Sequence, residues 1–346
     1  MVERPTVIVA PFRRRMSEIF APEDLERLHA TVDVFWGKDD PLTIDEAGQA
    51  LPNAVAIVGT NWPLGEVLDR AVKLRAILDV SGGFPREIDY DKCLARGIRI
   101  LTAAPAFGPQ VAEMALGMAL AASREIVAGD SAMREGNERW LHAGNETTFL
   151  LYGKPVGFIG FGSLGRSLRP LLAPFGCKIG VFDPWLSDGY IRSQGLVPLE
   201  LIDLLTSSKV IFVLAVPTAE NQALLTRDLL ERIQPGSVLV LISRAHVVDF
   251  DALTELVQAG RFKAAIDVFP TEPLPADHSI RQASGTVLSA HRAGSVPEGL
   301  VEIGRMVVDD LEAIARSLPP QRLQVAQPEL FGRYVRIAAP PPKAKG

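Results

Sequence analysis

Cysteine, long apolar runs and excess positive charge are all scarce in this sequence, and each scarcity excludes a class of protein. The two cysteines, Cys93 and Cys177, form no C-x-x-C pair, so we expect free thiols in a reducing cytoplasm. The first apolar run, residues 7–10, is too short for a secretory segment, and nothing in the sequence points to a membrane. The net charge of −5 does not suggest a nucleic-acid-binding protein.

Metal-ligand patterns are missing as well. The histidines and carboxylates form no cluster with ligand spacing, so we expect no bound metal. What the sequence does contain, 47% apolar and 22% charged residues, is typical of a soluble globular protein. Its 346 residues suffice for two domains of ordinary size, each with its own core.

The chain alternates short apolar runs with helical stretches. In the first hundred residues the apolar runs are 6–10, 32–35, 55–59, 76–80 and 98–101, and further on they are 156–159, 179–182, 209–216, 237–242, 263–268 and 286–289. Because the later runs are almost continuously apolar, both faces of their sheet should be covered by helices. This rhythm predicts parallel sheets flanked by helices.

Two longer helical stretches should link the two halves of the chain. The first is expected over residues 109–133 and the second over residues 297–318. The predicted fold is therefore α/β, with two doubly wound parallel-sheet domains and a cleft between them. We assign residues 1–102 and 295–346 to a flavodoxin-like substrate-binding domain and residues 103–294 to a Rossmann dinucleotide-binding domain.

A glycine-rich turn gives the strongest functional signal. The apolar run 156–159 leads directly into a G-x-G-x-x-G pattern, and helical spacing follows it. The first glycine permits the tight turn, the second lets the backbone approach a pyrophosphate, and the third lets helix and strand pack closely. The residues expected to bind the cofactor at this turn are Gly160, Gly162, Ser163, Leu164 and Gly165.

An acidic residue stands where a dinucleotide ribose would be recognised. Asp183 ends the next apolar run, eighteen positions after Gly165. No arginine or lysine adjoins it to neutralise a 2′-phosphate, because Pro184 and Trp185 follow. The carboxylate should accept hydrogen bonds from the ribose hydroxyls and repel NADP, so we predict NAD as the cofactor.

Polar residues also follow several other predicted strands, at the edge where open α/β sheets bind ligands. They comprise the turn Ser81, Gly82 and Gly83, the cation Arg244, the carboxylate Glu272 and the imidazole His291. A cation for a carboxylate, an imidazole for a carbonyl oxygen and a carboxylate to charge the imidazole together suit the reduction of a 2-oxo acid. His246 and His278 lie close to these residues in the sequence and remain alternatives to His291 as the acid.

In combination these motifs resemble the D-isomer-specific 2-hydroxyacid dehydrogenase family over nearly the whole chain. The resemblance rests on residues 111–113, the glycine turn, residues 243–249, residues 265–269, residues 272–274 and residues 288–291. It implies catalytic roles for Arg244, Glu272 and His291, and contact between Asp267 and the nicotinamide carboxamide. It also implies that amides around Gly82 and Gly83 hold the substrate carboxylate. The expected reaction interconverts a small 2-oxo acid, such as glyoxylate or hydroxypyruvate, and the D-2-hydroxy acid.

The chain departs from the family pattern at three places. Ser163 replaces an arginine in the glycine turn, and Ala245 replaces the glycine after Arg244. The substrate loop carries Phe84, Pro85 and Arg86 in place of the usual small residues and asparagine. These changes leave the identity of the acid open.

The resemblance leaves two alternative functions open and also bears on the oligomeric state. Dehydrogenases of formate and phosphite share the fold, although Glu272 replaces the glutamine expected with formate. A dinucleotide-sensing binding protein of corepressor type could retain the same residues. Trp140 and the run 149–151 supply apolar surface beside the helix predicted at 109–133, and similar enzymes pair through this region, so we expect a homodimer.

Overall fold

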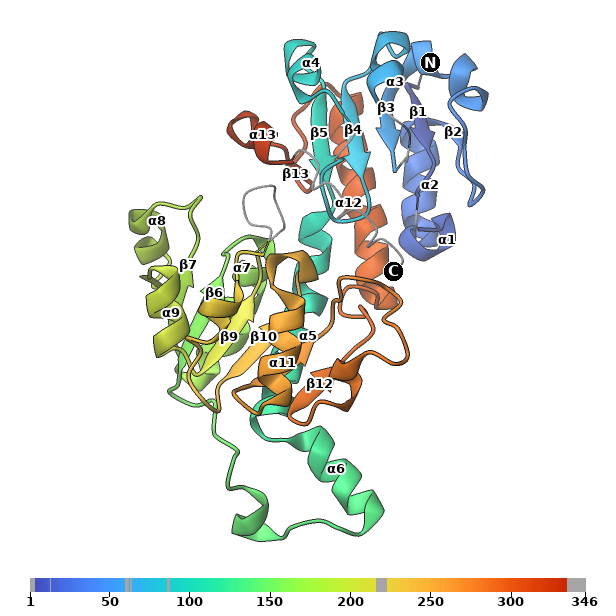
Figure 1. Ribbon diagram of the computed structural model, residues 1–346. Coiled ribbons are helices and arrows are strands. Elements are labelled where there is room, and N and C mark those ends of the chain that lie inside the picture. The colour runs from blue at the N-terminus through green and yellow to red at the C-terminus, as the bar shows by residue number, and fades with distance from the viewer. Residues whose placement is uncertain are drawn as a thin grey trace, which may run out of the picture. The chain divides into compact units, whose positions relative to one another are not determined.

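The computed structural model describes residues 4–12, 14–59, 62, 64–85, 88–215 and 223–334 (Figure 1). Contacts among these residues divide them into two compact units. Unit 1 comprises the described residues up to Phe107 together with those from Ser295 onward, and unit 2 comprises those between 108 and 294. Arg86 of the substrate loop lies outside the described residues.

Unit 1 is built on one sheet. Among the described residues this sheet has six strands in the order β13-β5-β4-β3-β1-β2. Neighbouring strands are parallel except β13, which runs antiparallel to β5. The order of the parallel strands, 2-1-3-4-5, is that of flavodoxin-like folds. The strands are β1 (Thr6–Val9), β2 (Asp33–Trp36), β3 (Ala54–Val58), β4 (Ala76–Asp79), β5 (Arg99–Thr102) and β13 (Gln324–Val325).

Helices cover both faces of this sheet. Along β1, Val7 and Val9 pack into the core on one face and Ile8 packs into the core on the other, as the alternation of a strand requires. The first core includes residues of α1 (Met16–Ile19), α2 (Pro22–Thr31) and α12 (Pro297–Ala315), and the second includes residues of α3 (Leu64–Arg70) and α4 (Tyr90–Ala95). Shorter elements are η1 (Glu46–Gln49), η2 (Leu51–Asn53), η3 (Ala104–Phe107), η8 (Pro328–Leu330) and α13 (Phe331–Tyr334).

Unit 2 carries a parallel sheet, which in the part of the chain described here has seven strands in the order β12-β11-β10-β9-β6-β7-β8. Counted from the first strand of the unit, its central order is 3-2-1-4-5-6, that of the Rossmann fold. The strands are β6 (Pro155–Ile159), β7 (Lys178–Phe182), β8 (Val197–Pro198), β9 (Val210–Val213), β10 (Val238–Leu241), β11 (Lys263–Ile266) and β12 (Thr286–Leu288).

Unit 2 also contains helices between most of these strands. They are α5 (Gly108–Ser123), α6 (Ile126–Glu135), α7 (Ser163–Leu172), α8 (Asp188–Ser193), α9 (Leu201–Ser207), α10 (Arg227–Leu230) and α11 (Phe250–Gln258). Single turns of 3-10 helix occur at η4 (Leu141–Gly144), η5 (Ala173–Phe175), η6 (Ala245–Val247) and η7 (Ser279–Gln282). The predicted α/β architecture with two parallel-sheet domains is confirmed.

The single helix predicted over residues 109–133 is wrong. In the structure α5 ends at Ser123 and α6 begins at Ile126. Glu125 lies between them with a φ of 53°, a left-handed conformation that a right-handed helix cannot continue through. Its carboxylate accepts a hydrogen bond from the Thr147 hydroxyl at 2.6 Å and pairs with the Lys263 ammonium at 2.6 Å. Contacts with distant residues therefore fix the break.

Candidate active site

Two glycines of the turn after β6 are required by the backbone itself. Gly160 has a φ of 93°, and a Cβ there would lie 2.8 Å from the Ala215 Cα. At Gly165 a Cβ would lie 2.9 Å from the Phe161 ring and 3.4 Å from the Gly160 carbonyl oxygen. The first and third glycines therefore permit the turn and the close approach of α7 to β6.

Gly162 differs from the other two because its neighbourhood is open. A Cβ at Gly162 would meet no heavy atom within 4 Å, although the residue caps the N-terminus of α7. The amides of the first helical turn, at Ser163, Leu164 and Gly165, have no carbonyl partner inside the helix. Open space in front of such amides suits a pyrophosphate, which the helix dipole also favours.

Asp183 follows the end of β7 and faces the glycine turn. Its carboxylate accepts hydrogen bonds from the Phe161 amide at 2.8 Å and from the Trp185 amide at 2.9 Å. A carboxylate offers about four acceptor positions, so two amides leave positions for the hydroxyls of a ribose. The open turn, the helix start and this carboxylate together fit a dinucleotide, and Ser163, Leu164 and Asp183 are the residues that would hold it.

A histidine and a carboxylate form a hydrogen-bonded pair in unit 2. The His291 Nδ1 lies 2.7 Å from the Glu272 Oε2, and the other carboxylate oxygen accepts a hydrogen bond from the Phe269 amide at 2.9 Å. His291 itself has a φ of 51°, and its amide donates to the Asp267 carbonyl oxygen at 2.8 Å. Backbone contacts thus hold both members of the pair, while more than a third of each side chain stays exposed to solvent.

The electrostatic surroundings keep Glu272 ionised. Partial burial raises the pKa of Glu272. Hydrogen bonds from His291 and the Phe269 amide, together with the charges of His291 and Arg244, lower this pKa by more than burial raises it. The net result is a pKa below the ordinary value. Arg244 follows β10 and donates a hydrogen bond to the Ser243 carbonyl oxygen at 2.8 Å. The three residues expected to be catalytic are therefore near enough to influence one another, within a single unit.

Asp267 has a structural position that the sequence does not reveal. Its side chain is fully buried, with one oxygen accepting from the Arg292 amide at 3.0 Å and the other from the Ala293 amide at 3.2 Å. The carboxylate thereby fixes the backbone that follows His291. Contact between Asp267 and a nicotinamide carboxamide stays a prediction.

A cavity of about 570 Å³ opens beside the histidine. Apolar side chains supply most of its wall, and the Ser289 hydroxyl near it is buried without a hydrogen-bond partner among the described residues. The residues that line the cavity are Phe269, Glu272, Pro273, Leu274, Arg281, Leu288, Ser289, Ala290 and His291.

The other two candidate histidines have different surroundings. The His278 Nδ1 accepts a hydrogen bond from the Ile280 amide at 3.2 Å, and its ring packs 5.8 Å from that of Phe250. His246 is exposed in η6. Because the Glu272 carboxylate contacts His291, the geometry favours His291 as the acid.

In unit 1 the loop after β4 contacts the carboxylate of Asp79, the last residue of that strand. Asp79 accepts hydrogen bonds from the Ser81 amide and the Ser81 hydroxyl, each at 2.7 Å, and the amides of Gly83 and Gly82 also act to lower the pKa of its carboxyl group. Burial raises the pKa of Asp79, although these hydrogen bonds act in the opposite direction. The amides expected to hold a substrate carboxylate are thus engaged by Asp79. Sequence reasoning missed this residue, whose signal is an aspartate two positions before a Ser-Gly-Gly turn.

The unusual residues of the same loop contact the end of the described chain. The Phe84 ring lies 4.5 Å from that of Tyr334, and the Tyr90 hydroxyl donates to the Pro85 carbonyl oxygen at 2.6 Å. The centroid of the Tyr90 ring also lies 4.9 Å from that of the Phe331 ring. We call Phe84, Tyr90, Phe331 and Tyr334 the aromatic clamp. It packs Phe84 of this loop against the end of the described chain.

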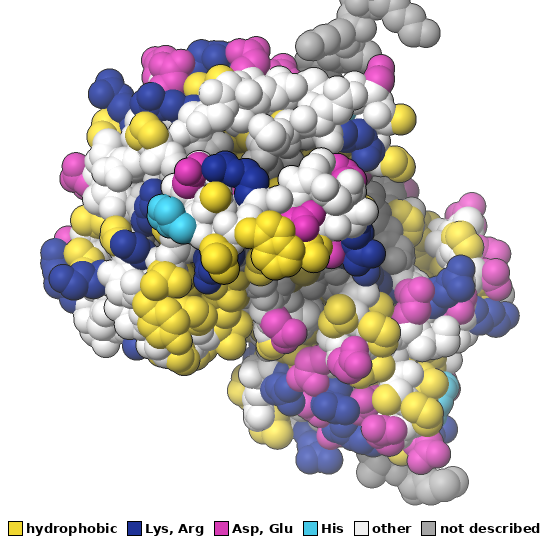
Figure 2. Space-filling model, turned by 90° about the horizontal axis from the view of Figure 1, so that it is seen from below, with side chains coloured by type: hydrophobic (Ala, Val, Ile, Leu, Met, Phe, Trp, Pro, Cys, Tyr) yellow, Lys and Arg dark blue, Asp and Glu magenta, His cyan; other side chains and the backbone are white. Residues whose placement is uncertain are grey.

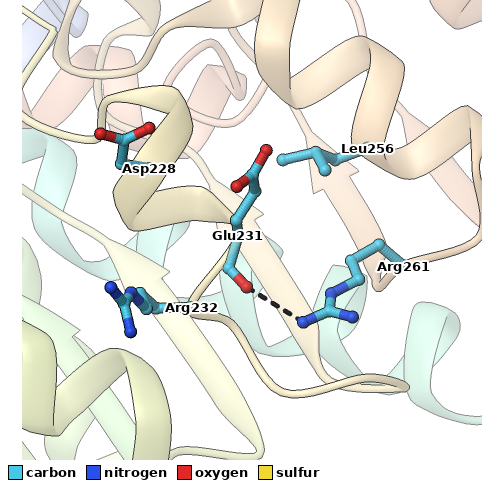
Figure 3. Close-up of a pocket in the computed structure, with 5 residues that line it drawn as sticks. All are labelled: Asp228, Glu231, Arg232, Leu256 and Arg261. Carbon is cyan, nitrogen blue, oxygen red and sulfur yellow. Dashed lines mark hydrogen bonds between the residues drawn. The ribbon is translucent and has the colours of Figure 1, made fainter.

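A different cavity, of about 600 Å³, lies between α10 and α11 (Figure 3). Its wall combines Asp228, Glu231, Arg232 and Leu256 with Arg261, which donates to the Glu231 carbonyl oxygen at 3.1 Å. Arg261 precedes β11, so this cavity is at the amino end of a strand. Ligands of open α/β sheets bind beyond the carboxyl ends, which makes it a poor candidate for the active site.

Two kinds of feature are absent from the described residues. No helix there is both long enough and apolar enough to cross a membrane. No group of three or more His, Cys, Asp or Glu side chains in the described part of the chain is arranged to hold a metal ion.

Known proteins share sequence and fold with this chain. The sequence profile described as "D-isomer specific 2-hydroxyacid dehydrogenase, NAD binding domain" matches residues 116–293. The chain is 30% identical over 326 residues to D-3-phosphoglycerate dehydrogenase of Mycobacterium tuberculosis, covering 93% of this chain but 59% of that enzyme. It is 28% identical over 260 residues to glyoxylate reductase of Korarchaeum cryptofilum, covering 74% of this chain and 77% of that enzyme.

A solved structure is similar over almost its whole length. It is a phosphoglycerate oxidoreductase from Rhizobium etli, with a TM-score of 0.83 and 39% sequence identity. The similarity covers 94% of this chain and 99% of that structure.

Proposed function

Because the chain belongs to the D-isomer-specific 2-hydroxyacid dehydrogenase family and carries its NAD-binding domain, we propose that it interconverts a small 2-oxo acid and the corresponding D-2-hydroxy acid. The observation that carries the proposal is the 2.7 Å contact between His291 and Glu272 beside a cavity of about 570 Å³. Units 1 and 2 would serve as the substrate-binding and dinucleotide-binding domains.

His291 is the proton donor of the proposed reduction. Its Nδ1 faces Glu272, so the Nε2 is the nitrogen that would give a proton to the carbonyl oxygen of the acid. The ionised Glu272 stabilises the protonated imidazole and holds the ring in one orientation. In the reverse direction the neutral ring would accept the proton from the hydroxyl. NAD, when bound, supplies or accepts the hydride at C2 of the acid.

Arg244 is the proposed ligand of the substrate carboxylate. A guanidinium presents a planar fork that matches a carboxylate, and Arg244 acts electrostatically on Glu272 in the same unit. We assign the turn from Ser81 to Gly83 to the wall of the substrate site. A carboxylate would compete for the amides of this turn with Asp79, which already accepts a hydrogen bond from the Ser81 amide.

Glyoxylate and hydroxypyruvate are the proposed substrates, since relatives with similar sequences include a glyoxylate reductase. The chain spans 59% of the length of the mycobacterial phosphoglycerate enzymes, so their activity does not transfer to it directly. We place the protein in the cytoplasm, consistent with the free thiols of Cys93 and Cys177. We also propose that it acts as a homodimer.

The proposal is tested by a screen of NADH oxidation with a panel of 2-oxo acids, with formate and phosphite offered to NAD in the reverse direction. We expect turnover with at least one 2-oxo acid and a higher kcat/KM for NADH than for NADPH, because Asp183 would repel a 2′-phosphate. NADH binding without turnover of any acid would favour the dinucleotide-sensing alternative. Turnover of formate or phosphite alone would assign the site to those substrates.

A further inference from the structure

Three lysines lie at the amino edge of the unit 2 sheet, opposite the edge that carries His291. Lys154 directly precedes β6, Lys209 directly precedes β9, and Lys263 is the first residue of β11. These parallel strands lie in the order β11-β10-β9-β6, so the three lysines share one edge of the sheet. The proposed reaction uses none of them.

Lys263 is engaged by its surroundings. Its ammonium lies 2.6 Å from the Glu125 carboxylate and donates a hydrogen bond to the Thr147 carbonyl oxygen at 2.8 Å. Only 12% of its side chain is exposed. This ammonium is therefore not available to an incoming group.

Lys209 has a different environment. Its ammonium lies 4.7 Å from the centroid of the Phe149 ring, which holds the side chain in place. A Cβ at Gly236, just before β10, would lie 3.6 Å from the same ammonium. Lys209 is partly buried, and no carboxylate among the described residues pairs with it. It is thus held at the edge and still open to solvent on one side.

The surroundings of Lys209 increase the share of its neutral amine. Burial lowers the pKa of Lys209, and the positive charges of Lys154 and Lys263 lower it as well. The neutral amine is the nucleophilic form of lysine, and desolvation or a neighbouring cation activates such an amine. Lys209 combines both features.

The charge of this edge selects the kind of reagent. Among the described residues, Glu125 is the one carboxylate that pairs with any of the three lysines. The edge therefore carries excess positive charge, which attracts small anions, and Lys154 is exposed to them. An acyl phosphate joins a negatively charged phosphate to an electrophilic carbonyl carbon. Lys154 can attract the phosphate while the amine of Lys209 reacts with the carbon.

We propose that Lys209 is a site of acylation by small acyl phosphates. The neutral amine attacks the carbonyl carbon, and the bond between this carbon and the phosphate oxygen breaks. Phosphate leaves with the proton that the nitrogen gives up, so the step needs no oxidant or reductant. Lys209 becomes an uncharged amide. The inference goes beyond the proposed function and does not rest on it.

The test uses the full chain and isotopically labelled acetyl phosphate. Peptide mass spectrometry measures the initial rate of acetylation at Lys209 and at Lys178, an exposed lysine that begins β7 in the same sheet. Lys209 should react at least about threefold faster than Lys178, because it is activated by burial and by neighbouring cations. Equal rates, or a faster Lys178, would overturn the inference. Both rates come from one wild-type sample, so the comparison needs no variant to fold.

Two variants test the neighbouring charge. Lys154→Gln removes a charge that lowers the pKa of Lys209 and attracts the phosphate, so acetylation of Lys209 should slow by about three- to tenfold. Lys178→Gln is the matched control, because Lys178 is not among the groups that shift the pKa of Lys209, and the rate should change by less than about twofold. Equal effects of the two variants would contradict the role of Lys154.

A neutral reagent separates attraction from nucleophilicity. Acetic anhydride carries no charge, so Lys154→Gln should slow its reaction with Lys209 less than it slows the reaction with acetyl phosphate. The same loss with both reagents would contradict the selection of acyl phosphates. The inference and the proposed function fail separately, because these acetylation rates are measured without turnover of any 2-oxo acid.

Discussion

The proximity of His291 and Glu272 could be anticipated from the position of each residue in the sequence. Each follows a predicted strand, so their approach at one sheet edge could be expected before the structure was known. The 2.7 Å contact between them agrees with that expectation. Asp267 and Asp79 could not be interpreted in the same way, because the amides they bond are set by loop conformation and leave no periodic pattern.

Glu272→Gln is the residue-scale prediction. The pKa of Glu272 lies below its ordinary value of 4.5, so the carboxylate is ionised throughout the neutral range. Its contribution to stability is present above the unfolded-state pKa and is lost only as pH falls through the lowered folded-state value. A decline of reduction at higher pH would therefore not come from the titration of Glu272.

The variant keeps the shape of Glu272 and removes the charge that stabilises the imidazolium. For Glu272→Gln, the descending limb of kcat/KM for the 2-oxo acid should move to lower pH, by about one unit. The oxidation of the hydroxy acid should gain over the same range. Steady-state rates measured across a pH series from roughly pH 5 to roughly pH 9 provide the measurement. An unchanged limb would rule out the pairing as the source of the pH dependence.

At the scale of elements, the β6–turn–α7 unit was predictable because three signals agree. The apolar run, the glycine spacing and the helical periodicity all indicate the same strand, turn and helix. The break at Glu125 was not predictable, because Lys263 and Thr147 that stabilise it are distant in the sequence. The C-terminal half of the aromatic clamp was missed for the same reason.

Two glycines of the turn allow folding and cofactor binding to be separated. Gly160→Ala should lower the free energy of unfolding by about 1–3 kcal/mol, because of its positive φ and the close Ala215 backbone. Gly162→Ala should change stability by less than about 0.5 kcal/mol, since its Cβ meets open space. The same variant should nevertheless raise the Kd for NADH by roughly tenfold or more, equivalent to about 1.4 kcal/mol.

Thermal unfolding and NADH fluorescence titration measure the two effects independently. The glycine assignment fails if Gly162→Ala binds NADH as tightly as the wild type. It also fails if Gly160→Ala is as stable as the wild type, because the turn would then not need its left-handed conformation.

The aromatic clamp makes a prediction about substrate binding. Tyr334→Ala removes the ring that packs on Phe84 and should raise KM for the 2-oxo acid several-fold, with kcat and the Kd for NADH nearly unchanged. Tyr334→Phe retains the ring and should retain the KM. If both variants behave like the wild type in steady-state assays, the clamp does not position the substrate loop.

At the scale of the whole molecule, the helix α6 and the segment after it expose many apolar side chains. The helix α6 extends away from the sheet of unit 2 (Figure 1), and none of its residues is buried. Hydrophobic side chains also gather on the surface seen from below in Figure 2. The strongly exposed apolar residues of this region are Ile126, Val127, Met133, Trp140, Leu141, Leu150 and Tyr152. A second copy of the chain would remove this surface from water.

We therefore expect a sedimentation mass of about twice 37.4 kDa at micromolar concentration. Leu141→Asp should shift the mass toward one chain, because Leu141 is 85% exposed in this segment. Leu94→Asp is the control, since Leu94 is 52% exposed in α4 of unit 1 and outside the proposed interface. A wild type that sediments as a single chain would contradict the dimer.

We propose that His291 gives the proton during NADH-dependent reduction of a 2-oxo acid. The most direct measurement is the rate of NADH oxidation by wild type and His291→Ala with the best acid of the panel, each after its NADH affinity has been determined. We predict wild-type turnover and a loss on the order of 10²–10⁴ in kcat for His291→Ala, with NADH binding retained. Equal turnover by the two proteins would contradict the claim.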